Sequence, residues 1–306
     1  MKAVICTKYG PPEVLHIVDV EKPVPKDKEI LVRIVAASVN SGDVRVRGLV
    51  VTGFMKIIFR FVIGFSKPRR PILGTVFSGV VEQIGSGVTQ FNAGDEVFGI
   101  TGFKFGTYAE YIAVNEKSNV LLKPVNTSFE EAAAIPFGGQ TAIYFLEKAG
   151  IKQKANLNVL IIGATGSVGS AAIQVAQHYS ANITAVCSSS GVEIARSLGV
   201  TNLILYDKED FTKYPMKFDI VFDAVGKTTK KQCLHLLNQG GVFKSVAGLE
   251  YASETKEQLV LLKELFEKGD YKAVIDKTFS MNEVVAAHRY VDTGRKKGNV
   301  VLKITE

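Results

Sequence analysis

The first part of the chain consists of short apolar stretches separated by turns. Up to about Val125, the segments 30–36, 76–84 and 108–114 are strand-like, and glycine-rich turns such as GSG at 85–87 lie between them. Short runs rich in β-branched and aromatic residues, bounded by Gly, Asn or Asp, are typical of strands. We therefore expect a compact β domain in this part.

The pattern changes from about Ser128, where helical segments such as SVGSAAIQVAQHY begin to alternate with short apolar runs. These runs are NVLIIG (158–163), NITAVC (182–187), NLILY (202–206), FDIVFDAVG (218–226) and GVFKSVAG (241–248). Such alternation is typical of a parallel sheet covered by helices on both faces. The last segments, IDKTF, NEVVAAHRYV and NVVLKIT, return to strand and helix and are expected to rejoin the first domain. We thus predict an α/β protein with a β domain over 1–126 and 271–306 and a doubly wound domain over 127–270.

The stretch GFMKIIFRFVIGF at 53–65 is unusually apolar. A membrane-spanning helix needs about 20 apolar residues, whereas the run 49–65 is shorter and contains Lys56 and Arg60. Each central charge costs about 2.5–3.5 kcal/mol on insertion, so we exclude a span. If the stretch is helical, one face holds Phe54, Ile57, Ile58, Phe61 and Phe65. We interpret it as a flap or wall of a substrate pocket, to which Phe54, Ile58 and Phe61 contribute. Core packing, lipid contact and dimer contact are the alternatives.

Composition narrows the classes of function. The net charge is +7, but the lysines are scattered, which disfavours nucleic-acid binding and is compatible with a phosphorylated cofactor. Three cysteines form no CxxC pair, and Met1 is not followed by a basic and then an apolar region. We therefore expect no secretory signal and a reducing, cytoplasmic location.

The clearest motif is NVLIIGATGSVGSAAIQVA at 158–176, in which a buried strand leads into Gly163, Gly166 and Gly169 and then a helix. Glycines in this context allow a tight turn and a close approach of the backbone to a pyrophosphate, which the helix N-terminus attracts. Thr165 and Ser167 can add hydroxyl donors. We predict a nicotinamide dinucleotide site. The alternatives are a flavin, a sugar nucleotide or a plain turn.

The choice between NAD and NADP depends on the end of the second strand, where an NAD site usually has an acid. The sequence there is AVCSSSG at 185–191, with no acid before Glu193. Ser188 and Ser189 would not repel a 2′-phosphate, and Tyr206 can donate to it. We predict NADPH.

Several further segments accompany the glycine loop. They are VNSGDVRVRG (39–48), PILGTVFSGVVEQIGSGVTQFNAGDEVFG (71–99), GTYAEYIAV (106–114), AAAIPFGGQTA (132–142), FDAVG (222–226) and AAHRYVDTGRKKGNVVL (286–302). Through these segments the chain resembles, over almost its whole length, the zinc-free quinone oxidoreductase-like branch of the medium-chain dehydrogenase/reductase superfamily. The resemblance implies a GroES-like catalytic domain, a Rossmann domain, and a cleft between them for nicotinamide and substrate.

The resemblance also assigns residues. Thr165, Gly166, Ser167, Val168, Ser188, Tyr206 and Ala224 match cofactor-contacting positions, and Thr141 would lie near the nicotinamide. Gly163, Gly169 and Ser189 complete the predicted cofactor site.

Zinc-dependent relatives carry a catalytic cysteine, a histidine followed by glutamate, and a four-cysteine structural site. Here Asn40 stands at the cysteine position, GTV at 74–76 replaces the histidine motif, and the four-cysteine cluster is absent. The four histidines show no ligand spacing (His16, His178, His235 and His288). We therefore predict no metal site.

Without a Lewis acid, the hydride acceptor should already be electrophilic, as a quinone, an enone or an activated aldehyde is. Asn40 is the first candidate for a donor or positioning group. Asp43 either belongs to the site or anchors Arg45 or Arg47. We predict an NADPH-dependent reductase of quinones or α,β-unsaturated carbonyls. The alternatives are a zinc-free alcohol/aldehyde oxidoreductase and an NADPH-binding redox sensor with little turnover.

One segment departs from the family pattern. After GVFKSVAG the chain passes quickly to the helical TKEQLVLLKELFEKG, where the family normally has another strand that often pairs across a dimer. We therefore leave open whether the Rossmann sheet has its sixth strand and whether the chain forms a homodimer.

Overall fold

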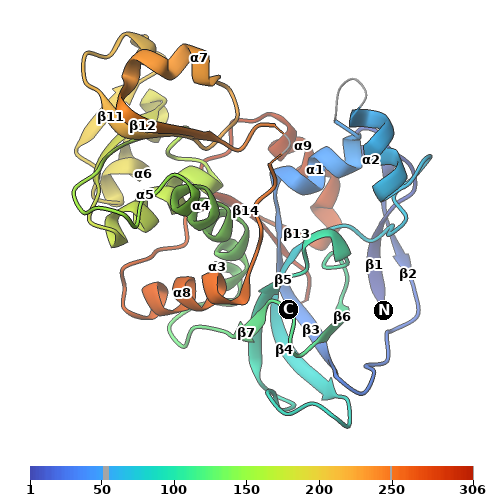
Figure 1. The fold of residues 1–306 in the computed structure, drawn as a ribbon. Coiled ribbons are helices and arrows are strands. Elements are labelled where there is room, and N and C mark those ends of the chain that lie inside the picture. The colour runs from blue at the N-terminus through green and yellow to red at the C-terminus, as the bar shows by residue number, and fades with distance from the viewer. Residues whose placement is uncertain (51–54, 249, 306) are drawn as a thin grey trace. The chain divides into compact units, whose positions relative to one another are not determined.

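The computed structural model describes residues 1–50, 55–248 and 250–305, and side chains at 55–58 lie outside the description. The chain divides into two compact units (Figure 1). Unit 1 comprises 1–136 and 275–306, and unit 2 comprises 137–274. The predicted first boundary, after 126, falls before a short helix that packs on the sheet of unit 1. A helical pattern alone therefore does not show to which unit a segment belongs.

Unit 1 is built on a seven-stranded sheet in the order β13-β14-β3-β4-β5-β7, with β6 also paired to β3, and on a separate β1-β2 hairpin. The long strand β3 pairs antiparallel with β4, β6 and β14, so the C-terminal strand returns to this unit. The strands are β1 (Lys2–Cys6), β2 (Leu15–Asp19), β3 (Glu29–Val39), β4 (Val76–Ile84), β5 (Glu96–Ile100), β6 (Tyr111–Asn115), β7 (Val120–Leu122), β13 (Ile275–Ser280) and β14 (Asn299–Lys303).

The helices of unit 1 lie at the ends and on the faces of this sheet. They are α1 (Ser41–Gly48), α2 (Met55–Ile63), α3 (Phe129–Ala134) and α9 (Val284–Asp292), with 3₁₀ turns η1 (Pro12–Val14), η2 (Gly102–Lys104) and η6 (Met281–Glu283). Apolar side chains of β3, β4, β14 and α9 form one buried cluster, and α1 contacts α9. This core fixes the start of α1, where the predicted catalytic residue Asn40 stands.

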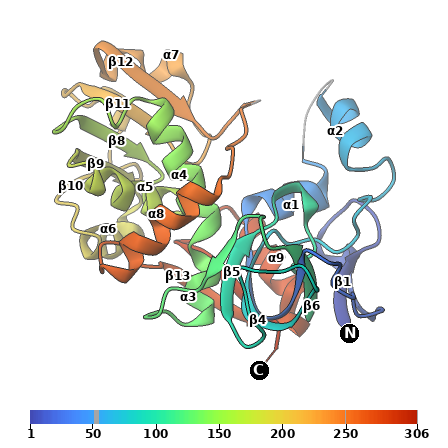
Figure 2. The ribbon, with the colours of Figure 1, turned by 60° about the horizontal axis from the view of Figure 1, so that its bottom comes forward.

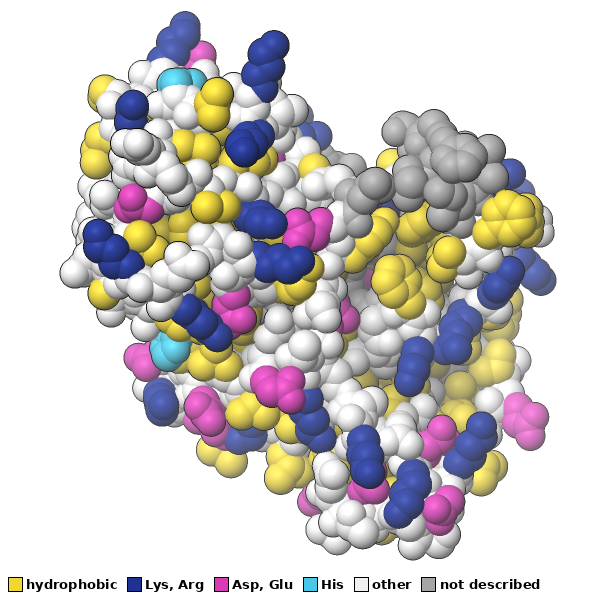
Figure 3. Space-filling model, in the orientation of Figure 1, with side chains coloured by type: hydrophobic (Ala, Val, Ile, Leu, Met, Phe, Trp, Pro, Cys, Tyr) yellow, Lys and Arg dark blue, Asp and Glu magenta, His cyan; other side chains and the backbone are white. Residues whose placement is uncertain are grey.

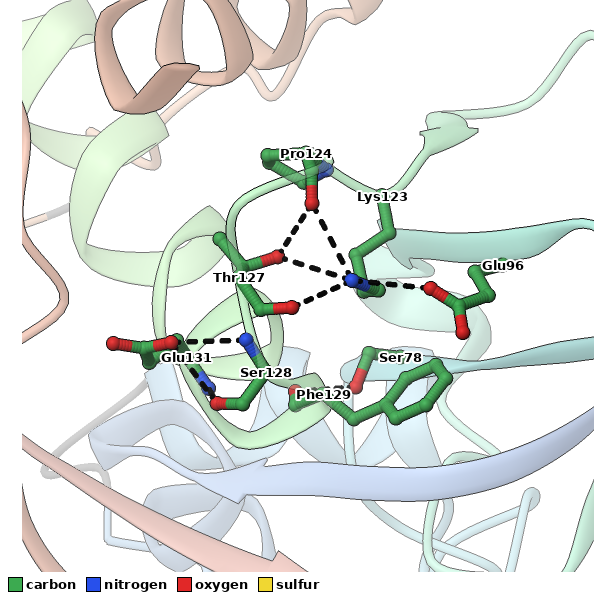
Figure 4. Close-up of polar contacts among 8 residues, drawn as sticks. All are labelled: Ser78, Glu96, Lys123, Pro124, Thr127, Ser128, Phe129 and Glu131. Carbon is green, nitrogen blue, oxygen red and sulfur yellow. Dashed lines mark hydrogen bonds and ion pairs between the residues drawn. The ribbon is translucent and has the colours of Figure 1, made fainter. Parts of the chain in front are cut away.

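A buried lysine fixes the chain between β7 and α3 (Figure 4). Lys123 Nζ donates to the backbone oxygen of Thr127 at 2.6 Å and lies 3.1 Å from a carboxylate oxygen of Glu96. Ser128 and Glu131 form a capping box at the start of α3. Because a buried ammonium is costly unless it is paired and hydrogen-bonded, these contacts hold the segment in one path.

Unit 2 is a parallel sheet covered by helices. The strand order is β10-β9-β8-β11-β12, which Figure 2 shows as a stack with β12 at one edge. The strands are β8 (Asn158–Ile162), β9 (Asn182–Cys187), β10 (Asn202–Leu205), β11 (Phe218–Asp223) and β12 (Leu237–Ser245). The helices are α4 (Pro136–Lys148), α5 (Ser167–His178), α6 (Val192–Ser197), α7 (Lys230–Cys233) and α8 (Lys256–Glu267), with 3₁₀ turns η3 (Ser189–Gly191), η4 (Phe211–Lys213) and η5 (Leu234–Leu236). Five strands pair in this sheet, and no sixth strand is found among the described residues.

The apolar stretch at 53–65 is helical where it is described, over Met55–Ile63. The face interpreted as a pocket wall, which includes Phe61 and Phe65, is not the side that packs on the core. Phe59 packs against the core and Ile63 is buried, whereas Phe61 and Phe65 are 59% and 54% exposed. Phe54 and the side chains of Ile57 and Ile58 lie outside the described residues. Because the stretch is apolar on nearly every side, its pattern does not specify which face turns inward. Within the described residues, no helix is both long and apolar enough to cross a bilayer.

Candidate active site

Asn40 is held by the start of α1. Its side-chain oxygen accepts from the backbone N–H groups of Gly42 at 2.8 Å and Asp43 at 3.1 Å, which is the bonding expected of an N-cap asparagine. Its amide nitrogen donates to Thr75 Oγ1 at 2.8 Å. Asn40 and Thr75 are 3% and 9% exposed, so the pair is nearly buried. By the resemblance noted from the sequence, Asn40 stands at the cysteine position and Thr75 at the histidine position of zinc-dependent relatives.

Asp43 is hydrogen-bonded to Asn40 of this pair and is fully buried. Its carboxylate accepts from the backbone N–H of Asn40 at 3.0 Å and from the hydroxyl of Tyr108 at 2.9 Å. Burial raises the pKa of Asp43 to about 7, although these hydrogen bonds oppose the rise. The expectation that Asp43 might anchor Arg47 is wrong, because Arg47 pairs with Asp292 at 2.7 Å. No bond from Arg45 to Asp43 is found in the described part of the chain.

Other buried polar groups surround the Asp43–Tyr108 pair. The ring of His288 stands edge-on to that of Tyr108, with centroids 5.6 Å apart. Burial, together with the charge of Arg47, lowers the pKa of His288 to about 3. His288 is therefore a neutral packing residue, as the sequence suggested, and is not placed as a metal ligand among the described residues.

In unit 2, two of the three glycines in the loop after β8, Gly163 and Gly169, have no room for a side chain. Gly163 has φ +73°, and a Cβ there would lie 2.3 Å from Val225. A Cβ on Gly169 would lie 2.2 Å from the oxygen of Gly163, so only glycine lets α5 pack so close to the loop. A Cβ on Gly166 would meet nothing nearer than 3.5 Å. The space over Gly166, at the N-terminus of α5, is therefore open to a pyrophosphate, and the residues fit the predicted dinucleotide.

The other predicted cofactor residues lie at the same edge of this sheet. Tyr206 follows β10, and its N–H donates to Cys187 at the end of β9, so it adjoins Ser188. Ala224 follows β11 and donates to Ile162 at the end of β8. Carboxyl ends of parallel strands are where open α/β sheets bind ligands.

Two further contacts tie neighbouring segments to the glycine loop. A Cβ on Gly191 would lie 2.7 Å from Thr165 Oγ1, and one on Gly138 would lie 2.5 Å from the oxygen of Ser167. The first contact brings the Ser188–Ser189 segment to the loop. The second brings α4 there, one turn before Thr141. Val168 and Thr141 are both nearly buried.

Asp207 places a negative charge at the end of the predicted cofactor site that would hold the adenosine. Its carboxylate accepts from the N–H of Ser189 at 2.9 Å. Although burial acts to raise its pKa, hydrogen bonds from Ser189 lower the pKa of Asp207 below its ordinary value. A carboxylate from the turn after β10 thus lies beside Ser189, although Ser188 and Ser189 are themselves neutral.

The side chains around Asn40 are poor metal ligands. Within the described residues, no group of three or more His, Cys, Asp and Glu side chains is placed to hold a metal ion. At the predicted catalytic position the side chains are an amide and a hydroxyl, Asn40 and Thr75, whereas zinc prefers thiolate and imidazole. These residues do not fit a catalytic zinc.

Comparisons with known proteins agree with this architecture. Residues 26–125 match the family model described as alcohol dehydrogenase GroES-like domain, and 167–282 match the one described as zinc-binding dehydrogenase. The 2-methylene-furan-3-one reductase of Solanum lycopersicum is 38% identical over 99% of this chain and 79% of its own length. The chloroplastic NADPH-dependent alkenal/one oxidoreductase of Arabidopsis thaliana is 32% identical over the same shares.

Among solved structures, the quinone oxidoreductase from Coxiella burnetii aligns with a TM-score of 0.88 and 30% identity, over 100% of this chain and 99% of that one. The chain therefore belongs to the medium-chain dehydrogenase/reductase superfamily, in its quinone oxidoreductase-like branch. The predicted fold, a GroES-like β domain with a Rossmann domain, is confirmed.

The sequence pattern does not single out three residues that contact the predicted site residues. Thr75 lies where zinc-dependent relatives have a histidine, and its bond to Asn40 joins residues 35 positions apart. Tyr108 lies in the strand-like segment 108–114, with nothing in the pattern to pair it with Asp43. Asp207 directly follows Tyr206, and that adjacency to a predicted cofactor residue was the available signal.

Proposed function

We propose that this protein is an NADPH-dependent reductase that transfers hydride to quinones or α,β-unsaturated carbonyls. The observation that carries the proposal is the Asn40–Thr75 pair at the catalytic position, a set of hydrogen-bond donors without metal ligands. The same substrate class is supported by the chain's membership of the family and by its similarity to an alkenal/one oxidoreductase and a quinone oxidoreductase. The residues around Gly166 would hold the cofactor, which supplies the hydride when bound.

The two side chains have complementary roles in this proposal. Thr75 Oγ1 accepts from Asn40 and, in the described part of the chain, donates to no other group, so its proton is available to a substrate oxygen. Asn40 Nδ2 has a second N–H for the same purpose. Donors fixed in place before reaction stabilise negative charge that develops on a carbonyl oxygen. Asp43 acts as a positioning residue, because it holds the backbone of Asn40.

We propose that the reaction proceeds without metal. An enone or a quinone is already electrophilic, so hydrogen-bond donors suffice to polarise it. Elemental analysis of the purified protein should find no stoichiometric zinc, and chelators should leave turnover intact. One zinc per chain, with activity lost on chelation, would overturn this part of the proposal.

The segment 53–65 is proposed as one wall of the substrate pocket. Phe61 is exposed and available to an apolar substrate. We also assign Phe54 and Ile58 to this wall. That assignment rests on the sequence alone, because their side chains lie outside the described part of the structure. We place the protein in a reducing compartment such as the cytoplasm, since Cys6, Cys187 and Cys233 are buried free thiols.

A substrate panel tests the proposal. The purified protein is given NADPH with quinones, enones and simple aldehydes of matched size, and products are identified by mass spectrometry. Consumption of NADPH with quinones or enones supports the proposal. Turnover confined to simple aldehydes favours an alcohol/aldehyde oxidoreductase. Tight NADPH binding without consumption over the whole panel favours a redox sensor.

A further inference from the structure

Unit 1 has an exposed apolar surface formed by the second half of α2 and the segment after it. Phe61, Val62 and Phe65 are all exposed, and the rings of Phe61 and Phe65 meet edge to face with centroids 4.8 Å apart. Large apolar side chains that gather on a surface mark an interaction site, whereas single ones do not.

This surface is built on fixed backbone. Tyr9 donates from its hydroxyl to the oxygen of Gly64 at 2.8 Å, and the N–H of Arg69 donates to the oxygen of Ile63 at 2.7 Å. Phe59 and Ile63 anchor the opposite side of α2 in the core. The outward position of Phe61 and Phe65 is therefore set by the packing of α2 and not by a loose chain end.

Basic side chains border the exposed rings. Arg60, Lys67, Arg69 and Arg70 are exposed in the same segment. Arg70 also donates to the backbone oxygen of Lys104 at 2.9 Å, which joins η2, with its exposed Phe103 and Lys104, to the segment. Hydrophobic and basic side chains lie next to each other on this part of unit 1 in Figure 3.

The segment that carries this surface has basic but no acidic residues. Between Val44 and Val81 the sequence holds seven Arg or Lys residues and no Asp or Glu. Arg47 is buried and paired with Asp292, whereas Arg60, Lys67, Arg69 and Arg70 are exposed at the surface. A short helix with apolar rings between cationic side chains is the pattern of helices that lie in the interface of an anionic bilayer.

We propose that the surface formed by Val62, Phe65, Lys67, Arg69, Arg70 and Phe103 binds peripherally to anionic lipid bilayers. The aromatic rings enter the boundary between headgroups and acyl chains, and the cations bind lipid phosphates. Such docking would bring the protein to lipophilic carbonyl compounds dissolved in the bilayer. The binding itself does not depend on the proposed reductase activity, and it is measured without substrate or NADPH.

Co-sedimentation with vesicles tests the proposal. The full chain is mixed with vesicles of phosphatidylcholine alone, or with about one third phosphatidylglycerol, at about 0.1 M salt. We expect binding at least about tenfold stronger to the anionic vesicles, and its loss at about 0.5 M salt. Equal binding to the two kinds of vesicle, or none to either, would overturn the proposal.

Matched charge variants localise the effect. Lys67→Glu with Arg69→Glu should reduce anionic-vesicle binding to the level of neutral vesicles. Lys230→Glu with Lys231→Glu makes the same change in net charge on exposed α7 of unit 2 and should leave binding intact. If the two double variants lose binding equally, diffuse charge is responsible and the assignment to this surface falls. Lys67→Gln with Arg69→Gln is a milder pair should the charge reversal unfold the chain.

Apolar variants separate lipid from a second copy of the chain. Phe65→Ser should weaken vesicle binding several-fold, whereas Leu234→Ser, which removes an equally exposed apolar side chain from unit 2, should not. Sedimentation velocity without vesicles completes the test. A dimer that Phe65→Ser dissociates would show that this surface is a protein interface and would overturn the lipid assignment.

Discussion

Asn40 Nδ2 donates a 2.8 Å hydrogen bond to Thr75 Oγ1 and so joins the start of α1 to the start of β4. The same asparagine also caps α1 through its side-chain oxygen. One side chain therefore has a structural role and a proposed chemical role. Substitutions that separate the two roles are the most informative.

Replacing Asn40 tests its two roles. Asn40→Ala removes the cap and the donor, so we expect a loss of about 1 kcal/mol in the free energy of unfolding together with lower kcat. Asn40→Ser keeps a capping hydroxyl and should restore stability, but kcat should stay low while NADPH affinity is kept. Chemical unfolding and steady-state kinetics of both variants provide the measurement. A serine variant with wild-type kcat would show that Asn40 is structural only.

Thr75 offers a sharper comparison, because Thr75→Val nearly preserves the shape and removes only the hydroxyl. Loss of one donor to a developing oxyanion costs about 10²- to 10³-fold in strong cases. We expect about tenfold in kcat, since an enone or quinone is already electrophilic. Thr75→Ser retains the hydroxyl and should recover most of the activity. Equal activity of the valine and serine variants would remove Thr75 from the site.

Asp43 and His288 impose opposite pH dependences on stability. The folded pKa of Asp43 is about 7, above the ordinary value of about 3.9. Its contribution to the free energy of unfolding is therefore present at low pH and is lost as pH rises through 7. The folded pKa of His288 is about 3, below the ordinary value of about 6.5. Its contribution is present above about pH 6.5 and is lost as pH falls toward 3. Between about pH 4 and 6.5 the two effects partly cancel.

Asp43→Asn should leave the pH dependence of stability to His288. The free energy of unfolding of this variant should rise from about pH 4 to about pH 6.5 more steeply than that of the wild type. Urea unfolding across this range is the measurement, with Asp19→Asn on the surface as the control. Parallel curves for the wild type and Asp43→Asn would contradict the buried, proton-binding carboxyl.

Asp207 should restrain the preference for NADPH. Its carboxylate accepts from Ser189 N–H, close to the residues predicted to meet the 2′-phosphate. The carboxylate would repel a 2′-phosphate, although water screens the repulsion at an exposed site. Asp207→Asn should therefore tighten NADPH by about two- to fivefold and leave NADH unchanged. Fluorescence titration of both cofactors tests this, and a similar change for both would point to a rearranged loop.

The proposed pocket wall predicts a change in substrate selection. Phe61→Ser should raise KM for bulky apolar quinones far more than for small ones, and thermal stability should be kept because the ring is exposed. Steady-state kinetics on a size series of quinones is the measurement. A uniform loss over the series, with stability lowered by several kcal/mol, is the behaviour of a core residue and would exclude the wall.

Much of the fold could be predicted from the sequence, because apolar residues mark the strands that are buried in the core. The run NITAVC at 182–187 coincides with β9, and VFSGVVEQI at 76–84 coincides with β4. The neighbourhood of the predicted cofactor residues follows from the same pattern. Ser188, Tyr206 and Ala224 directly follow the apolar runs of β9, β10 and β11, and parallel strands end at one edge of a sheet.

The polar contacts across the fold were not predictable in the same way. The Tyr108–Asp43 bond joins residues 65 positions apart, and Asp207 reaches Ser189 only because β9 and β10 are neighbours. The face of α2 that turns inward was also missed. Phe59 and Ile63 form that face, and in a segment apolar all round only packing decides between it and the face of Phe61.

Deuterium transfer tests the central claim most directly. The protein is given NADPH labelled with deuterium at C4 of the reduced nicotinamide, together with an α,β-unsaturated ketone, and the product is analysed by mass spectrometry and NMR. The account predicts a saturated ketone with one deuterium at the carbon β to the carbonyl, formed at the same rate after treatment with a chelator. An allylic alcohol with deuterium at the carbonyl carbon, or no consumption of NADPH with any quinone or enone tested, would contradict it.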